Sequence, residues 1–262
     1  MAPLPIALTI AGSDSGGGAG IQADLKTFHH FHAFGTSVIT AVTAQNTRGV
    51  QGWFAVPVPM IQAQIDAVAG DLRPDATKTG MLADAAIVEA VAASIRRHAL
   101  APLVVDPVMV SASGDALLAE NAVQAMRELL IPLATLVTPN LDEAETLVGG
   151  VVRDVEAMER AGRVLVARGA TAALIKGGHL VGDAAIDVLV HGDRVRVFTH
   201  PRLDTRHTHG TGCTLSSAIT ALLARGTELD AAVERSIEWV HRAIATAPAL
   251  GGGHGPLNHW AD

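Results

Sequence analysis

A run of small residues at positions 209–214 could bind an anion. The run reads HGTGCT and leads directly into a segment with apolar residues at 215, 218, 219 and 222, the spacing of one helix face. The first turn of a helix leaves backbone N–H groups unpaired at the positive end of the helix dipole, which suits a phosphate group. Cys213 falls in this turn, where thiol pKa values are lowered, although a lone cysteine is otherwise most often a buried structural residue.

A second glycine-rich stretch follows the first apolar run of the chain. Residues Gly12–Gly20 read GSDSGGGAG, between the strand-like run Ile6–Ile10 and a helix-like segment. Glycines allow a backbone to approach a ligand closely, although a flexible turn has the same composition. The spacing fits neither the G-x-x-x-x-G-K-[ST] of P-loop proteins nor the G-x-G-x-x-G of dinucleotide-binding folds. The stretch therefore indicates close backbone contact without a standard nucleotide-binding motif.

Polar residues also follow three further strand-like runs. These runs and residues are Leu103–Val105 before Asp106, Ala134–Val137 before Asn140, and Ala172–Ile175 before Lys176. In open α/β sheets, ligands bind where the strands end. A lysine there can bind nucleotide phosphates, and a carboxylate can serve catalysis or a Mg²⁺–nucleotide complex. The same residue types also occur as a solvated lysine, a turn-forming Asp and, for Asn140 with Glu143, a helix capping box.

The elements that would position these residues alternate between strand-length apolar runs and helix-period segments. Weaker strand candidates are Ser37–Val42 and Ala76–Thr79, and residues 88, 91, 92 and 95 follow the spacing of a helix face. Residues Asp183–His200 alternate in polarity around a His-Gly-Asp turn, which predicts an antiparallel hairpin at the sheet edge. We therefore expect one α/β domain over residues 1–262, with a central, mostly parallel sheet flanked by helices.

The composition supports a large buried core and argues against several classes of function. The 262 residues are 49% hydrophobic and carry a formal net charge of −7, with only 3% aromatic residues. An acidic chain poor in aromatics lacks the positive field and the stacking surfaces of nucleic-acid-binding proteins. One cysteine excludes a disulfide framework and a cysteine-rich zinc site, and the histidines at 29, 30 and 32 lack nearby carboxylate or cysteine partners for a metal.

The chain shows no sequence signal for a membrane or for export. Its longest stretch without Asp, Glu, Lys or Arg is Thr27–Thr47, which contains histidines, Gln45 and Asn46 and is therefore not expected to span a bilayer. The first residues lack the basic region of a secretory signal. We therefore expect a cytoplasmic protein without membrane partners.

Taken together, these segments resemble the ribokinase-like superfamily and, within it, the hydroxymethylpyrimidine/phosphomethylpyrimidine kinases of thiamine biosynthesis. The resemblance covers nearly the whole chain in order. It is carried by AGSDSGGGAGIQADLKTF at 11–28, AVTAQNT at 41–47, KTGML at 78–82, DPVMV at 106–110, TPNLDEAE at 138–145, KGGH at 176–179, HGTGCT at 209–214 and GHGP at 253–256. One departure is Ala112, which stands where relatives often have a longer polar residue.

The resemblance implies an ATP-dependent kinase with a ribokinase-like fold. Its substrate would be 4-amino-5-hydroxymethyl-2-methylpyrimidine, phosphorylated first on the hydroxymethyl group and then to the diphosphate. Gln45 would contact the pyrimidine ring, because its amide can donate and accept at once, and Gly12, Asp24 and Met81 would line the same pocket. Members of the family commonly form homodimers, so we expect a homodimer.

The resemblance also implies how the phosphate side of the site is built. The anion hole and catalytic loop would consist of Gly210, Thr211, Gly212 and Cys213. Cys213 stands where sugar kinases carry a catalytic Asp, so its thiolate is the candidate base, and Cys213→Ala would impair the first phosphorylation more than the second. We expect the nucleotide to be held by Lys176, Asn140 and Asp106, with Glu143 organising Mg²⁺ and phosphates partly through water.

Three alternatives remain open at the level of sequence. A pyridoxal kinase shares the glycine-rich start and the cysteine-containing loop, while Met81 and the Gln45 region favour the pyrimidine. A catalytically silent ligand-binding module on the same fold would not need the 210–213 loop, Lys176 and Glu143 together. A dehydrogenase is disfavoured because the dinucleotide motif is missing.

Overall fold

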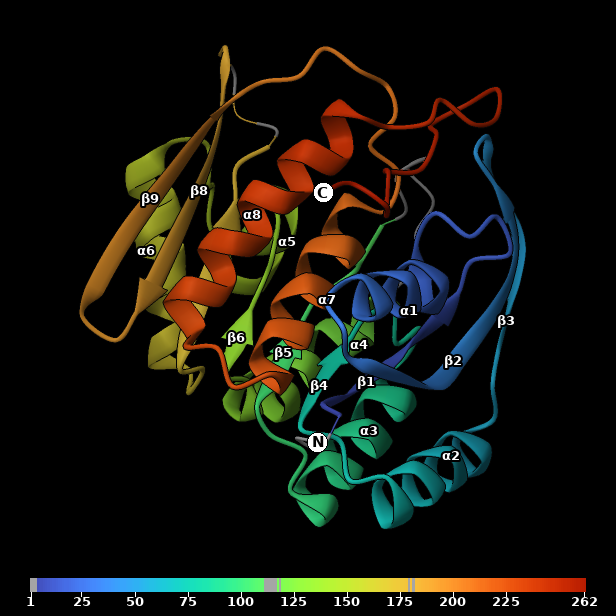
Figure 1. The fold of residues 1–262 in the computed structure, drawn as a ribbon. Coiled ribbons are helices and arrows are strands. Elements are labelled where there is room, and N and C mark those ends of the chain that lie inside the picture. The colour runs from blue at the N-terminus through green and yellow to red at the C-terminus, as the bar shows by residue number, and fades with distance from the viewer. Residues whose placement is uncertain (1–3, 111–116, 118, 179, 181) are drawn as a thin grey trace.

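In the part of the chain that the structure describes, nine strands form one sheet with helices on both faces (Figure 1). A computed structural model describes residues 4–110, 117, 119–178, 180 and 182–262, so Ala112 lies outside the described residues. The six central strands are parallel: β2 (Phe34–Asn46), β1 (Ile6–Ser13), β4 (Ala76–Thr79), β5 (Leu103–Val105), β6 (Leu136–Val137) and β7 (Ala172–Lys176). Antiparallel strands flank them: β3 (Gly49–Ala55) at one edge, and β8 (Ala184–His191) with β9 (Arg194–Pro201) at the other. The expected fold class is confirmed.

Each face of the sheet carries its own layer of helices. One face packs against α2 (Val58–Asp71), α3 (Ala85–His98), α4 (Glu120–Ala125), α5 (Leu141–Val148) and α6 (Val155–Ala167). The other face packs against α1 (Gly20–His30), α7 (Thr211–Ala224) and α8 (Leu229–Ala245). The chain between α4 and β6 continues through a π-helical turn at Met126–Leu130 and a 3₁₀ turn at Ile131–Leu133.

The two cores follow from the alternation of side chains along each strand. In β7, Ala172 and Leu174 lie in the core beneath α7 and α8, whereas Ala173 and Ile175 lie in the core beneath the other helices. Successive side chains of a strand point to opposite faces of a sheet. Strands that are buried on both faces therefore read as continuous apolar runs, as the sequence shows.

Two edges of the sheet differ in how well the sequence predicts them. The hairpin expected within Asp183–His200 is confirmed as β8–β9. In contrast, β2 extends beyond the expected Val42 to Asn46, and its antiparallel partner β3 was not expected. Residues of β3 are mostly exposed, so the strand has no alternating apolar pattern to reveal it. The extension of β2 carries Gln45, which lies at a break in the β2–β3 register.

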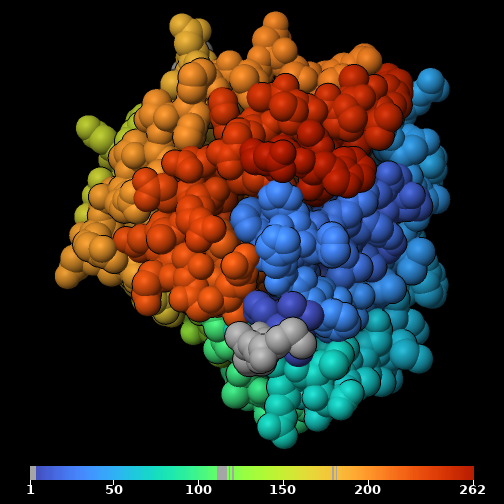
Figure 2. All heavy atoms as spheres, in the orientation of Figure 1, coloured from blue at the N-terminus to red at the C-terminus, as the bar shows by residue number. Residues whose placement is uncertain are grey.

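The C-terminal part of the chain packs against the N-terminal part. Figure 2 shows the C-terminal segment, in red, lying beside the blue region that includes α1. His30 at the end of α1 stacks on Trp239 of α8 with ring centroids 4.7 Å apart, so it serves packing. Within the described residues, no group of three His, Cys, Asp or Glu side chains is arranged to hold a metal, and no helix is long and apolar enough to cross a bilayer.

Candidate active site

The carboxyl ends of β5 and β7 meet the beginning of α7. Asp106 follows β5, and its Oδ1 lies 3.2 Å from Nζ of Lys176 at the end of β7. A Cβ atom on Gly212 would lie 3.1 Å from the same Nζ, so the first turn of α7 lies directly against this ion pair. Parallel strands end at one edge of the sheet, which is why residues 70 positions apart in sequence meet here.

The edge hairpin supports the turn that follows Lys176. Strand β8 pairs with β7 and places Asp187 opposite Lys176. The Asp187 carboxylate accepts a hydrogen bond of 2.9 Å from the backbone N–H of Gly177. Burial raises the pKa of Asp187 to about 6, while the Gly177 hydrogen bond and the Lys176 charge act in the opposite direction. The hairpin therefore fixes the backbone next to the lysine.

Asn140 and Glu143 form the capping box that the sequence left open. The Asn140 side chain accepts from the Glu143 N–H at 2.9 Å, and the Glu143 carboxylate accepts from the Asn140 N–H at 2.7 Å. Glu143 does more than cap the helix, because its carboxylate also interacts electrostatically with Lys176 and Asp106. Burial raises its pKa to about 7, the Asp106 charge adds to this, and the Lys176 charge works against it.

Lys176 remains positively charged despite its burial. Burial alone would lower its pKa, but the negative charges of Asp106 and Glu143 hold the pKa above the ordinary lysine value. Lys176 is therefore a cation that interacts with two carboxylates, those of Asp106 and Glu143. Mg²⁺ usually binds through one or two carboxylates together with substrate phosphates. Asp106 is 2% exposed and both its oxygens accept hydrogen bonds, from Lys176 and Thr138 on one side and from Ser216 on the other, so Glu143 is the carboxylate that fits a metal brought by the nucleotide.

The start of α7 is shaped as the sequence predicted for an anion site. Gly210 precedes the helix with φ of +83°, and a Cβ there would lie 1.8 Å from the Gly18 carbonyl oxygen, so only glycine fits. The Thr214 N–H makes a helical bond of 2.8 Å to the Gly210 carbonyl. No side chain among the described residues caps this helix. The Thr211 N–H donates to the Thr208 carbonyl at 3.2 Å, so the amides of Gly212 and Cys213 are the ones left available to an anion.

The expectation of a lowered thiol pKa at Cys213 is wrong. Burial raises the pKa of the thiol from the ordinary 9.0 to about 12, and the charges of Asp24 and Asp106 push in the same direction. The Lys78 charge and a backbone hydrogen bond from Gly20 act against this but do not offset it. Helix position alone therefore did not decide the protonation state, and the thiol is neutral near pH 7.

Residues expected on the acceptor side fall into two neighbouring groups. A Cβ on Gly12 would lie 3.0 Å from the Met81 sulfur, so these two residues are in contact. Thr40 of β2 donates a hydrogen bond of 2.6 Å to the Met81 carbonyl and holds that turn. Gln45, further along β2, lies with its amide nitrogen 3.4 Å from Nε2 of His209, the residue just before the anion loop.

The expectation that Asp24 lines the acceptor pocket is wrong, because the residue is fully buried. Its Oδ1 accepts from Lys78 Nζ at 2.9 Å and from Ser217 Oγ at 2.6 Å, and its Oδ2 accepts from Thr9 at 2.6 Å. Burial would lower the pKa of Lys78, but the charge of Asp24, the other negative charges nearby and the Asp24 hydrogen bond together outweigh it and keep the pKa above the usual range. Both carboxylate oxygens thus have protein partners, and Asp24 serves as a buried ion-pair partner.

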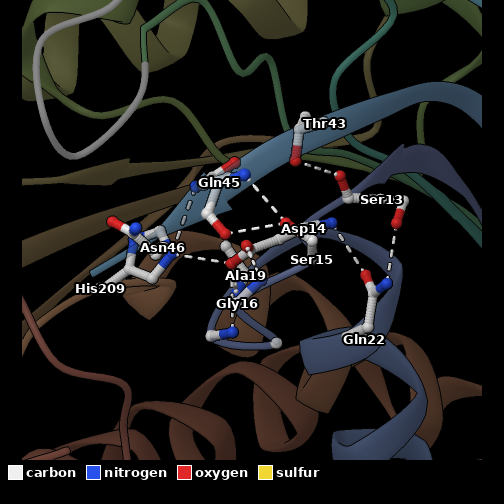
Figure 3. A network of polar contacts seen from close by, with 12 residues as sticks. Ser13, Asp14, Ser15, Gly16, Ala19, Gln22, Thr43, Gln45, Asn46 and His209 are labelled. Carbon is white, nitrogen blue, oxygen red and sulfur yellow. Dashed lines mark hydrogen bonds and ion pairs between the residues drawn. The ribbon is translucent and has the colours of Figure 1, made fainter. Parts of the chain in front are cut away.

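The glycine-rich loop after β1 is organised by Asp14. Its carboxylate accepts hydrogen bonds from the backbone N–H groups of Gly16, Gly18 and Ala19 at 2.8, 3.1 and 2.8 Å. Figure 3 shows these bonds converging on Asp14, with His209 on its other side. Several amides of this loop are therefore already paired within the protein. Close backbone approach is present, but part of it is to the chain's own Gln45, Asn46 and His209.

Lys78, Asp14 and His209 lie within the sequence motifs, but the sequence alone did not indicate their roles. A signal existed for Lys78: the chain contains only three lysines among its 19 basic residues, and two of these are Lys78 and Lys176. No comparable signal pairs Asp14 with His209, which are 195 positions apart.

Comparison with known proteins gives consistent matches over the whole chain. The family model described as phosphomethylpyrimidine kinase matches residues 14–258. A hydroxymethylpyrimidine/phosphomethylpyrimidine kinase of Streptomyces coelicolor is 52% identical, covering 98% of this chain and 95% of that protein. The corresponding kinase of Bacillus subtilis is 49% identical, covering 97% of this chain and 94% of that protein.

A solved structure of a related enzyme matches the fold closely. The ADP complex of Bacillus subtilis pyridoxal kinase superimposes with a TM-score of 0.92 at 40% identity, covering 99% of this chain and 98% of that chain. The fold is thus shared with a pyridoxal kinase.

Proposed function

Because this chain belongs to the phosphomethylpyrimidine kinase family, we propose that it is the ATP-dependent kinase that phosphorylates 4-amino-5-hydroxymethyl-2-methylpyrimidine and then its monophosphate. The reaction serves thiamine biosynthesis. The observation that carries the assignment to a site is the meeting of Lys176, Asp106 and the uncapped start of α7 at one edge of the sheet. Phosphoryl transfer needs mainly positioning and charge stabilisation, which these groups supply.

The site has a phosphate-binding end and an acceptor-binding end, each formed by different residues. The amides of Gly212 and Cys213 bind the equatorial oxygens of the transferring phosphoryl group, and Lys176 neutralises charge on the nucleotide phosphates. Asn140 holds Glu143 in place through the capping box. Mg²⁺ would be held by Glu143 together with phosphates and would supply neutralisation of phosphate charge, while Asp106 holds Lys176 in place through the ion pair. Gln45, Gly12 and Met81 orient the acceptor ring.

A coupled assay with the free pyrimidine alcohol, ATP and Mg²⁺ tests this function directly. Mono- and diphosphate should both accumulate, with the monophosphate appearing first. Pyridoxal serves as the competing acceptor, because the matched pyridoxal kinase shares the fold. Faster turnover of pyridoxal than of the pyrimidine would move the assignment to that substrate, and no ADP release with either acceptor would contradict the proposal.

We further propose that residues 1–262 act as one kinase domain in a cytoplasmic homodimer. The nine strands found among the described residues belong to one sheet, which supports a single domain. Val42 and Phe54 form a cross-strand pair on the β2–β3 edge and are 50% and 70% exposed, which supports self-association there. The net charge of −7 supports a small-molecule substrate rather than a nucleic acid.

Replacing Gln45 with alanine is expected to raise the KM for the pyrimidine about tenfold or more. The change removes the side-chain amide that faces the acceptor ring, and a lost hydrogen bond of about 1.4 kcal/mol corresponds to a factor of ten. The KM for ATP should stay within about twofold, because Gln45 lies on the acceptor side. Steady-state kinetics with each substrate varied in turn provide the measurement, and an unchanged pyrimidine KM would place the ring elsewhere.

Cys213→Ala is now expected to slow both phosphorylations to a similar extent. A thiol with a pKa of about 12 holds roughly a thousandfold less thiolate at neutral pH than one with a pKa of 9.0, so it is a poor base for the first step. The side chain at position 213 instead helps to position the loop of residues 210–213, and this loop is needed equally in both steps. Single-turnover rates for each step give the comparison, and iodoacetamide should alkylate the wild-type thiol about a thousandfold more slowly than free cysteine. If Cys213→Ala slowed only the first phosphorylation, Cys213 would be the base of that step after all.

A further inference from the structure

A polar network joins the glycine-rich loop, the end of β2 and the residue before the anion loop (Figure 3). Its centre is Asp14, which is 2% exposed, and His209, which is 8% exposed. His209 Nε2 lies 2.9 Å from Asp14 Oδ2 and 3.4 Å from the amide nitrogen of Gln45. One imidazole nitrogen thus faces both a carboxylate and the side chain that orients the acceptor ring.

The hydrogen bonds around Asp14 determine which way the proton on His209 lies. Three backbone N–H groups donate to the two carboxylate oxygens, so the carboxylate accepts on both sides. Burial works against its ionisation, but the His209 hydrogen bond, the His209 charge and the backbone donors together lower the pKa of Asp14. An ionised carboxylate can only accept. Nε2 of His209 must therefore carry the hydrogen in the neutral ring.

This tautomer fixes the orientation of the Gln45 amide. A protonated Nε2 cannot accept from the Gln45 NH2 group, so nitrogen facing nitrogen would be repulsive. The two ends of a side-chain amide have nearly the same shape, and a half-turn about the last bond exchanges them. After that half-turn Oε1 faces the Nε2–H group and shares it with Asp14. The NH2 group then occupies the other end of the amide, where Gln45 has no side-chain partner among the described residues.

The backbone of Gln45 is held by the same loop. Ser15 Oγ donates to the Gln45 carbonyl at 2.8 Å and accepts from the Gln45 N–H at 2.8 Å. These two hydrogen bonds lie where the β2–β3 register breaks. They therefore hold the Gln45 backbone at a point where the regular hydrogen bonding between β2 and β3 is interrupted. Loop residues Asp14 and Ser15 thus control the side chain and the backbone of Gln45 separately.

We propose that Asp14, acting through the Nε2–H group of His209, holds the Gln45 amide with its NH2 group toward the acceptor substrate. This orientation selects an aromatic ring that carries a hydrogen-bond acceptor, such as an unprotonated ring nitrogen, at the edge facing Gln45. Asp14 and His209 are positioning residues and Gln45 is the specificity residue. The inference rests on the proposed function in that Gln45 contacts the ring.

Two variants of His209 with similar length test the proposal. His209→Gln keeps a side-chain N–H near the position of Nε2, whereas His209→Met removes it. The acceptors are the pyrimidine and two analogues in which one ring nitrogen or the other is replaced by C–H. Wild type and His209→Gln should discriminate against one analogue about tenfold or more in kcat/KM, and His209→Met should lose most of this discrimination with little change in the KM for ATP.

The outcomes separate the inference from the function on which it rests. Equal discrimination by His209→Met and wild type would overturn the role of His209 while leaving the kinase intact. Absence of turnover by wild type with any of the acceptors would contradict the proposed function instead. Thermal melting of each variant shows whether it is folded.

A measurement on the wild-type protein decides the tautomer without any variant. Nitrogen-15 spectra of histidine-labelled protein at about pH 8, where an ordinary imidazole is neutral, report which ring nitrogen carries the hydrogen. The His209→Gln spectrum identifies the His209 signals. A hydrogen on Nε2 is the expected result, and a hydrogen on Nδ1 alone would overturn the proposal even if His209→Met fails to fold.

Discussion

Replacing Lys176 with methionine is expected to lower kcat for both phosphorylations by about a thousandfold. Lys176 is the cation between Asp106 and Glu143, and its Nζ lies against the first turn of α7. Phosphoryl transfer gathers negative charge on the transferring group, and loss of one preorganised charge-stabilising group typically costs two to three orders of magnitude, about 2.7–4 kcal/mol. The KM for ATP should rise as well, because two carboxylates would then face the phosphates without a cation.

The fold should survive this change because a proton can replace the lost charge. The Lys176 charge works against the burial that raises the pKa of Glu143 to about 7. Without it the Glu143 pKa rises further, so Glu143 is neutral at pH 7 and its repulsion with Asp106 is relieved. The residual activity of the variant should therefore increase toward higher pH over the range where Glu143 ionises and can again serve Mg²⁺.

Kinetics of both steps, with melting curves as the folding check, provide the measurement. Lys26→Met is the matched control, since it removes the same charge from a lysine whose Nζ bonds the Gly17 carbonyl outside the cluster. The control should keep kcat within about threefold. Lys176→Arg should not restore activity, because a forked guanidinium does not fit a buried site built for a compact ammonium. A loss of less than about tenfold in Lys176→Met would show that this lysine is not at the transferring phosphate.

Replacing Asp24 with asparagine is expected to destabilise the protein by about 3–5 kcal/mol. The change keeps the size of the side chain but leaves the Lys78 ammonium without its counter-charge in a fully buried place. Removing one partner of a buried ion pair has a cost of this size because the remaining charge stays desolvated. The hydrogen bonds from Thr9 and Ser217 add to the loss, since both were made to a carboxylate.

The dependence of stability on pH distinguishes this mechanism from simple loss of packing. In the wild type the folded-state pKa of Lys78 lies above its unfolded value, so the pair stabilises fully below about pH 10 and its contribution fades above that. In Asp24→Asn, burial dominates and the folded-state pKa falls below the unfolded one. The unfolded chain then binds the extra proton, so the stability of the variant should rise between about pH 7 and pH 10.

Urea unfolding at several pH values measures both effects. The double variant Asp24→Asn/Lys78→Met is the matched control, because it removes both charges and should be more stable than the single variant. A single variant as stable as wild type, or a double variant no better than the single one, would contradict the buried ion pair. Kinetic effects of Asp24→Asn should accompany lost stability, since both carboxylate oxygens of Asp24 are bonded within the protein.

The sequence by itself determined the architecture, because strands and helices follow from local patterns. Apolar runs gave the central strands, and alternation around residues 191–193 gave the edge hairpin. The run Ala76–Thr79 predicts β4 to the residue. The sequence also indicated that Lys176 and Asp106 would lie at strand ends, because the carboxyl edge of a parallel sheet is where polar residues can end an apolar run.

Tertiary structure decided the charges and partners of the side chains. The position of Cys213 in a first helical turn predicts a lowered pKa, yet burial and the nearby carboxylates Asp24 and Asp106 raise it to about 12. The loop glycines suggested backbone amides free to bind a ligand, yet three of these amides donate to the Asp14 carboxylate. His209, which is 195 residues further along the chain, also contacts Asp14. Burial and Coulomb interactions depend on what surrounds an atom in space, and neighbours in space are not neighbours in sequence.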